Sequence, residues 1–133
     1  MTLELHVLVA AAVLGLLHLV LVAQLSNRHR GYLRWAAGAR DVTSAPLPPV
    51  TARLERAYRN YMETFPYFAG VTLVAHALDV HSGLTEWGAL LYLGARILYV
   101  PLYASGIWLL RSLVWNVAFL GIALTITAIV RGS

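Results

Sequence analysis

Four long runs of apolar residues constrain most strongly how this chain can fold. They are separated by one long basic loop and two short connections, and each run is close to the ~20 residues that a helix needs to cross the apolar part of a bilayer. We place the four spans at about residues 3–25, 54–80, 86–110 and 113–130. The sequence therefore predicts an all-α integral membrane protein, a single domain in which four helices pack as a bundle.

The composition favours the same class of protein. Of the 133 residues, 59% are hydrophobic and 12% are charged, and the mean hydropathy is +0.69. A soluble domain is on average about half apolar and a quarter charged, so both values point to a membrane protein. The chain has no cysteine, which excludes a disulfide, a thiolate metal ligand and a cysteine nucleophile. Any thiol chemistry must therefore come from a substrate.

The charge distribution predicts how the chain is oriented in the membrane. The net charge of +4 is concentrated in the loop of residues 26–53. By the positive-inside rule this loop is expected on the cytoplasmic side and both termini on the other, so we attribute the charge to topology and not to nucleic-acid binding. The N-terminus lacks the basic region and cleavage site of a signal peptide, and we expect the first span to be retained. All ten basic residues are arginine, a usage that favours a bacterial inner membrane.

Two polar residues of the first span require an explanation, Glu4 near its start and His18 inside it. A carboxylate at a helix start is stabilised by the helix dipole, whereas a single histidine within a span is expected to donate an interhelical hydrogen bond. Glu4 lies too close to the end of the span to act as the membrane-embedded carboxylate of a small multidrug exporter, one alternative function for a four-span chain. His76 and Asp79 are one turn apart, but two ligands make a weak metal site, and no metal is predicted.

A polar face on the second predicted helix is the main indication of function. Five residues recur at helical spacing and share this face: Arg56, Arg59, Asn60, Glu63 and Tyr67. The apolar run that follows indicates that the face enters the membrane, where unpaired charges are costly. Arginine holds carboxylates bidentately, which lysine cannot do, and Glu63 together with Asn60 suits an ammonium group or a peptide amide.

Arg96 is the most informative single residue, because it lies inside the third span on a stripe with Tyr92, Tyr99 and Tyr103. An arginine there costs at least ~2.5–3.5 kcal/mol unless it faces protein or water. It could form a structural pair with Glu63 on the neighbouring helix. Arginines outnumber glutamates near the cytoplasmic boundary, however, and this surplus predicts an anionic ligand. We expect a small zwitterion with more than one carboxylate, beside apolar space that holds a lipophilic substrate.

Two segments resemble known family motifs. Residues 56–66, Arg-Ala-Tyr-Arg-Asn-Tyr-Met-Glu-Thr-Phe-Pro, resemble the signature of the MAPEG family, the membrane-associated proteins in eicosanoid and glutathione metabolism. Residues 96–103, Arg-Ile-Leu-Tyr-Val-Pro-Leu-Tyr, resemble the pattern on the third helix of that family. The resemblance implies a four-helix protomer, assembly as a homotrimer, and glutathione bound at the subunit interfaces near the cytoplasmic side.

The resemblance also implies roles for individual residues. Arg59, Asn60 and Glu63 would hold the carboxylates, amide and ammonium of glutathione. Three residues of the third helix would belong to the same site, with Tyr99 and Tyr103 lining it and Arg96 pairing within it. In the family an arginine from the end of the first helix of the next subunit also contributes, and Arg30 is our choice for it over Arg28 and Arg34.

For thiol activation the resemblance points to Arg111, with Ser112 beside it. The thiol of glutathione has a pKa near the ~8.5 of free cysteine, and a guanidinium or hydroxyl donor near the sulfur would stabilise the thiolate for attack on an electrophile dissolved in the membrane. Trp115 departs from the family pattern, which has a tyrosine there. The function predicted first is a membrane-bound glutathione transferase, with peroxidase activity toward lipid hydroperoxides as an extension.

A second function is a non-catalytic lipid-binding scaffold of the same family. Trp115 motivates this alternative, because it replaces a tyrosine of the enzymes. Arg59, Asn60 and Glu63 argue against it, since a scaffold has no need of them. In either case the partners expected are membrane lipid, a lipophilic small molecule and further copies of the chain.

Overall fold

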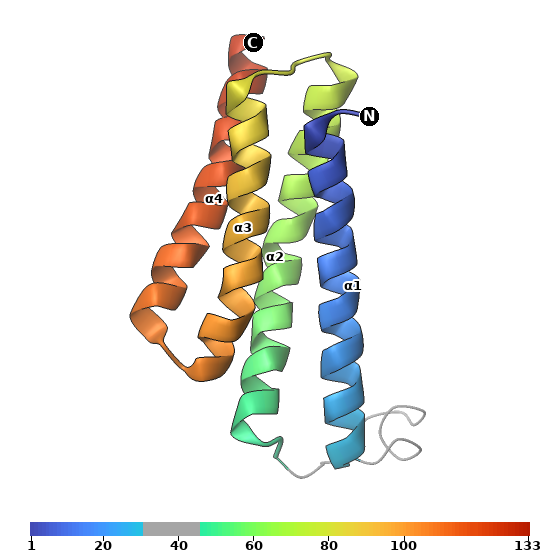
Figure 1. Cartoon of the computed structure of the whole chain (residues 1–133), viewed down its shortest axis with the longest axis vertical. Coiled ribbons are helices and arrows are strands. Elements are labelled where there is room, and N and C mark those ends of the chain that lie inside the picture. Colours follow the sequence, from blue (N-terminus) through green and yellow to red (C-terminus); the bar gives the residue numbers. More distant parts are fainter. Residues whose placement is uncertain (31–45) are drawn as a thin grey trace.

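The computed structural model describes residues 1–30 and 46–133, except for the side chain of Arg30. Figure 1 shows the helices of this part of the chain running alternately up and down, so that both termini lie at one end of the bundle. Their bounds are Leu3–Arg30 for α1, Pro49–Ala77 for α2, Gly83–Ser105 for α3 and Trp108–Arg131 for α4. The predicted all-α four-helix fold is confirmed. We call the end with both termini the terminal end, and the opposite one, with the α3–α4 turn, the polar end.

The helices form two packed pairs. α1 lies along α2 and α4 lies along α3, and α1 and α4 are on opposite sides of the α2–α3 pair (Figure 1). By length and composition, α1 and α4 are apolar enough to cross a membrane. α2 is a continuous helix, but the charged face that the sequence identifies interrupts its apolar character in the first half.

The boundary between the third and fourth helices differs from the sequence prediction. The third span was expected to continue to residue 110, with the connection at Arg111 and Ser112. Instead α3 ends at Ser105, because Gly106 adopts a left-handed conformation with φ of 80° that terminates the helix. The connection is therefore Gly106 and Ile107, and both Arg111 and Ser112 lie within the first turns of α4.

α1 and α2 extend further into the basic loop than the predicted spans. α1 continues to Arg30, where the first span was placed to residue 25, and α2 begins at Pro49 and not near residue 54. A proline at the first position of a helix is favourable, since the N–H that it lacks would have no intrahelical partner there. The loop is thus shorter than residues 26–53.

The core between α2, α3 and α4 depends on aromatic stacking and on glycine. The rings of Phe68 and Tyr92 are stacked with centroids 4.0 Å apart, and both side chains are fully buried. Where α3 crosses α4, a Cβ on Gly88 would lie 2.6 Å from the backbone oxygen of Gly121, and one on Gly121 would lie 2.5 Å from that of Gly88. Only glycine allows this close approach, which fixes the position of α4 against α3.

α1 is held to α2 by two polar side chains. His18 Nε2 donates a hydrogen bond to the backbone oxygen of Leu54 at 3.0 Å, which confirms its predicted interhelical role. Tyr61 donates its hydroxyl proton to the backbone oxygen of Ala11, and its ring lies against Gly15. Both contacts satisfy groups that would otherwise be unpaired within the bundle.

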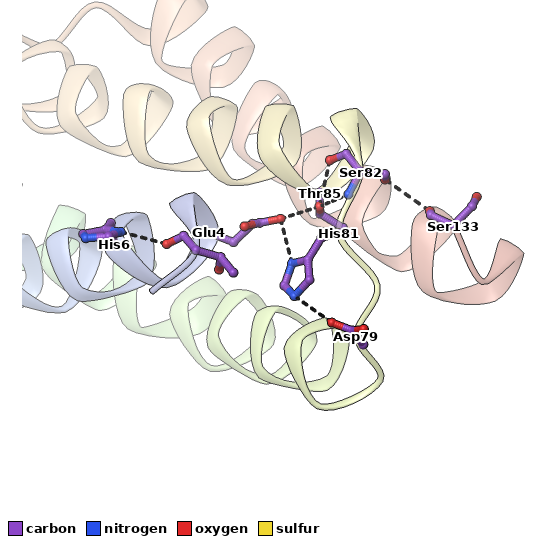
Figure 2. Close-up of polar contacts among 8 residues, drawn as sticks. Glu4, His6, Asp79, His81, Ser82, Thr85 and Ser133 are labelled. Carbon is purple, nitrogen blue, oxygen red and sulfur yellow. Dashed lines mark hydrogen bonds and ion pairs between the residues drawn. The ribbon is translucent and has the colours of Figure 1, made fainter.

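At the terminal end a polar network explains Glu4, whose side chain is only 7% exposed. Figure 2 shows its carboxylate between two groups, accepting from Thr85 Oγ1 at 2.6 Å and facing His81 Nδ1 at 3.3 Å. The other ring nitrogen of His81 lies 3.8 Å from Asp79. Glu4 therefore ties α1 to the α2–α3 turn. Within the described residues no group of three or more acidic or histidine side chains is arranged to hold a metal ion.

Candidate functional site

A pocket of about 310 Å³ opens at the polar end between α2, α3 and α4. We call it the first pocket. α2 supplies four of its lining residues, α3 supplies two tyrosines and α4 one arginine. The residues are Arg56, Arg59, Asn60, Glu63, Tyr99, Tyr103 and Arg111.

The α2 wall of this pocket follows from helix geometry. Arg56, Asn60 and Glu63 are spaced at i, i+4 and i+7, so they lie above one another on one face. The opposite face of the same turns is buried against the other helices. Arg59 stands at the edge of the polar face, where its side chain is 69% exposed and one nitrogen lies 3.6 Å from Glu55. α2 therefore presents basic and acidic groups at different heights along one wall of the pocket.

Tyr103, in the last turns of α3, brings two guanidinium groups to the pocket from different helices. Arg56 Nε donates to the Tyr103 hydroxyl at 3.2 Å, and its guanidinium lies 6.0 Å from the ring centroid. The Arg111 guanidinium lies 4.8 Å from the same centroid. Cations within about 6 Å of an aromatic face are attracted by it, so Tyr103 offsets part of the repulsion between these arginines.

Arg96 lies behind the pocket wall and not on it, and only 1% of it is exposed. Its Nη1 donates to Asn60 Oδ1 at 2.9 Å, and its guanidinium lies 5.2 Å from the ring of Tyr61 and 4.5 Å from that of Tyr99. The sequence allowed a structural pair with Glu63, whereas the hydrogen-bond partner in the structure is Asn60. Because the Asn60 oxygen is used by Arg96, its NH₂ group is the part that a ligand would meet.

A second pocket of about 280 Å³ adjoins the first. The two share Asn60, Tyr99 and Arg111, and the second adds Ser112, Trp115 and Asn116 from α4. The Ser112 hydroxyl donates within its own helix, to the backbone oxygen of Trp108 at 3.1 Å. Of the predicted catalytic pair, Arg111 is thus the side chain that reaches both pockets.

An apolar groove of about 320 Å³ runs between α2 and α4 next to these pockets. Most of its lining is aliphatic or aromatic: Tyr67, Val71, Phe119, Ile122, Ala123 and Ile126, with Glu63, Thr64 and Trp115. Glu63 also lines the first pocket, and Trp115 also lines the second. The Trp115 ring is stacked on Phe119 with centroids 5.9 Å apart. Polar and apolar volumes therefore meet at Glu63 and Trp115.

The structure brings most of the predicted site residues together. Seven of them line the two pockets: Arg59, Asn60, Glu63, Tyr99, Tyr103, Arg111 and Ser112. Arg96 supports the wall through Asn60. Arg30 is the last residue of α1, and its side chain lies outside the described part of the chain, so its contact with a neighbouring subunit stays a prediction.

The predicted site omitted Arg56, although it lines the first pocket and bonds to Tyr103. The signal was present in the sequence, because Arg56 has the i, i+4, i+7 spacing to Asn60 and Glu63 that places three side chains on one face. Arg59, which was chosen instead, is one residue before Asn60 and so lies toward the edge of the face.

Comparison with known proteins agrees with the motifs. The family model of the MAPEG family matches residues 5–131, essentially the whole chain. A search of curated protein sequences gave no significant match. The chain therefore belongs to the MAPEG family, which places its role in glutathione or eicosanoid metabolism in general.

Proposed function

We propose that the protein is an integral membrane glutathione-dependent transferase that joins the glutathione thiolate to lipophilic electrophiles. The observation that carries the proposal is that the polar pockets are continuous with the apolar groove. The first pocket, with three arginines and one glutamate, shares Glu63 with the apolar groove, and the second pocket shares Trp115 with it. A water-soluble zwitterion and a membrane-soluble partner can therefore lie side by side.

The first pocket matches glutathione group by group. Glutathione has two carboxylates, one ammonium group and two amides. Arg56 and Arg59 can bind carboxylates through their planar guanidinium groups, and Glu63 can accept from the ammonium group. The Asn60 NH₂ group, oriented by Arg96, can donate to a peptide carbonyl. Arginine outnumbers glutamate by three to one in this pocket, in agreement with a ligand that carries more carboxylates than ammonium groups.

Arg111 is the residue best placed to stabilise the thiolate. It lines both pockets, beside Tyr99, where the polar space turns toward the apolar groove. A fixed cation near the sulfur lowers the free energy of the thiolate relative to the thiol. The sulfur then forms a bond to the electrophilic carbon, the leaving group departs with the bonding electrons, and the thiol proton passes to solvent. With a lipid hydroperoxide, attack of the thiolate on the terminal oxygen would break the O–O bond, release the lipid alcohol and leave glutathione sulfenic acid, which a second glutathione thiol would convert to the disulfide and water.

The same proposal includes the membrane and the assembly. The outward face of α1 carries exposed aliphatic side chains, which suits contact with lipid tails and not with water. They are Val9, Val13, Leu16, Leu17 and Val20. We propose that all four helices span a bacterial inner membrane, with residues 26–53 on the cytoplasmic side. Three copies would form the functional unit, with Arg30 of one subunit completing the site of the next.

The test is glutathione binding and turnover by detergent-purified protein. Isothermal titration calorimetry of the native chain should show saturable binding that weakens strongly in Arg56→Ala. Arg131→Ala provides a matched control, because this arginine ends α4 at the terminal end. Incubation with glutathione and an aryl chloride should give the conjugate by mass spectrometry. Absence of binding by the native chain would refute the transferase proposal.

The apolar groove also supports a second candidate, a non-catalytic lipid-binding protein. A groove of about 320 Å³ lined by aliphatic and aromatic side chains can hold an acyl chain whether or not a reaction follows. The two candidates differ in one measurement. A fluorescent fatty acid that binds with the same affinity with and without glutathione, while no conjugate forms with any electrophile, would favour the lipid-binding protein.

A further inference from the structure

We propose that Arg53 is a positioning residue that fixes the α3–α4 turn and, through it, the place of Arg111. Arg53 lies in α2, one helical turn before Arg56, yet it lines neither of the polar pockets. Its partners are the end of α3 and the turn itself. The link to catalysis depends on the proposed transferase function, but the contact that fixes the turn does not.

The end of α3 leaves a carbonyl group that the turn cannot satisfy. The Gly106 N–H bonds to the Tyr103 oxygen at 3.1 Å, and the Ile107 N–H bonds to the Leu102 oxygen at 3.3 Å, as in a Schellman motif. Neither bond reaches the oxygen of Ala104, and helix ends leave such carbonyls without intrahelical partners. Arg53 Nη1 donates to it at 3.3 Å. Its positive charge is also favoured at the C-terminus of a helix dipole.

Gly106 provides the space that the Arg53 side chain occupies. A Cβ on this glycine would lie 3.3 Å from Arg53 Cζ, 3.4 Å from Nη1 and 3.5 Å from Nη2. The guanidinium therefore packs directly against the position that a Cβ would take, so a side chain there would require the arginine to shift by a few tenths of an ångström. Because Gly106 also has φ of 80°, the same residue both ends α3 and seats Arg53. The arginine thus contacts the last turn of α3 at Ala104 and the α3–α4 turn at Gly106, and two points of contact restrict rotation as well as translation.

Arg111 depends directly on this turn. The connection consists of Gly106 and Ile107 alone, and the backbone N–H of Arg111 bonds to the Ile107 oxygen at 3.2 Å. A rotation of the turn would therefore move the first turn of α4 and shift the Arg111 guanidinium from its place 4.8 Å over Tyr103. Catalytic geometry tolerates little displacement, since about 1 Å can reduce a rate by roughly 100-fold.

Enzyme kinetics test the functional part of the proposal, with Arg53→Ala, Arg53→Lys and Arg131→Ala compared with the native chain. In Arg53→Ala we expect glutathione affinity by calorimetry to stay within about threefold, while kcat falls about 10- to 100-fold. The pH profile of kcat should move to higher pH, because a displaced Arg111 stabilises the thiolate less and the thiol pKa rises. Arg53→Lys should recover part of kcat, since its ammonium can still donate to Ala104.

Distance measurements between spin labels test the structural part without glutathione. The chain has no cysteine, so Val50→Cys in α2 and Leu109→Cys in α4 introduce unique, exposed labelling positions. The distance distribution should be narrow with Arg53 present and broader in Arg53→Ala, and it should stay narrow in Arg131→Ala.

The kinetic and distance measurements distinguish failure of the proposed role of Arg53 from failure of the proposed transferase function. An unchanged label distribution in Arg53→Ala would overturn the proposal, as would a lower kcat with an unshifted pH profile, because that result indicates a general loss of folded protein. If the native chain showed no glutathione turnover, the proposed function would fail. The label distances would still decide whether Arg53 fixes the turn.

Discussion

Replacing Asn60 with alanine tests the contact that connects the pocket to the interior of the bundle. The Arg96 guanidinium is almost completely buried, and its hydrogen bond to Asn60 Oδ1 is 2.9 Å long. Its Nε and Nη2 atoms have no hydrogen-bond partner among the described residues. Asn60→Ala would therefore remove the one hydrogen bond that the structure gives to this buried cation.

The expected loss of stability in Asn60→Ala follows from the positive charge of the donor, Arg96. Hydrogen bonds to charged groups contribute about 1.5–3 kcal/mol, and leaving a buried charge unsatisfied costs at least as much. We expect Asn60→Ala to lower the free energy of unfolding by about 2–3 kcal/mol. Arg96→Met keeps an unbranched side chain and removes the charge, so Asn60→Ala should cost much less in that background. The coupling between the two sites should exceed about 1 kcal/mol.

A double-mutant cycle gives the coupling directly. The native chain, both single variants and the double variant would be unfolded reversibly in mixed micelles by increasing denaturing detergent, with helix content followed by circular dichroism. Glutathione affinity, measured in parallel, should also fall in Asn60→Ala because the amide faces the pocket. Additivity within about 0.5 kcal/mol would show that the two residues do not depend on each other, and our account of Arg96 would be wrong.

Three further changes test separate parts of the structure. Arg56→Ala should raise the Kd for glutathione about 10-fold or more, since a charge-assisted hydrogen bond contributes about 1.5–3 kcal/mol and 1.4 kcal/mol is tenfold; calorimetry beside Arg131→Ala measures it. Trp115→Ala removes the ring between the second pocket and the apolar groove, so kcat/KM should rise for bulky electrophiles relative to small ones at unchanged glutathione affinity. Gly121→Ala places a Cβ 2.5 Å from a backbone oxygen of α3, whereas at Gly70 nothing lies within 4 Å of the added Cβ. Gly121→Ala should therefore lower the free energy of unfolding by about 1–3 kcal/mol, and the control Gly70→Ala should not.

Each of these expectations has a clear contrary result. Equal affinities in Arg56→Ala and Arg131→Ala would remove Arg56 from the site. A selectivity that does not change with electrophile size in Trp115→Ala would show that the ring does not separate the two spaces. Similar stabilities of Gly121→Ala and Gly70→Ala would mean that α3 and α4 are not in close contact at this crossing.

The sequence predicted those features that depend on periodicity and hydropathy. Four apolar runs gave the four helices, and their even number placed both termini at one end. Helical spacing placed Asn60 and Glu63 on one face, and burial of a lone His18 implied an interhelical bond. These properties are local, since they follow from the repeat of a helix and from the free energy of burying each side chain.

The end of α3 could not be found in this way. The apolar character continues from residue 107 to 110, beyond the residue where the helix stops, and hydropathy contains no information about φ. The stop depends on Gly106 in a left-handed conformation, with Arg53 of another helix occupying the space beside it. As a result, Arg111 was placed in a connection when it belongs to α4.

The tertiary structure also determines which side chains form hydrogen bonds from one helix to another. Helical spacing puts Asn60 and Glu63 on the same face, but the rotation and height of α3 decide that Arg96 bonds to Asn60. The same packing selects Arg56 to bond to Tyr103 and leaves Arg59 at the edge. A sequence determines which side chains share a face of one helix, whereas contacts across helices depend on how all the buried surfaces fit together.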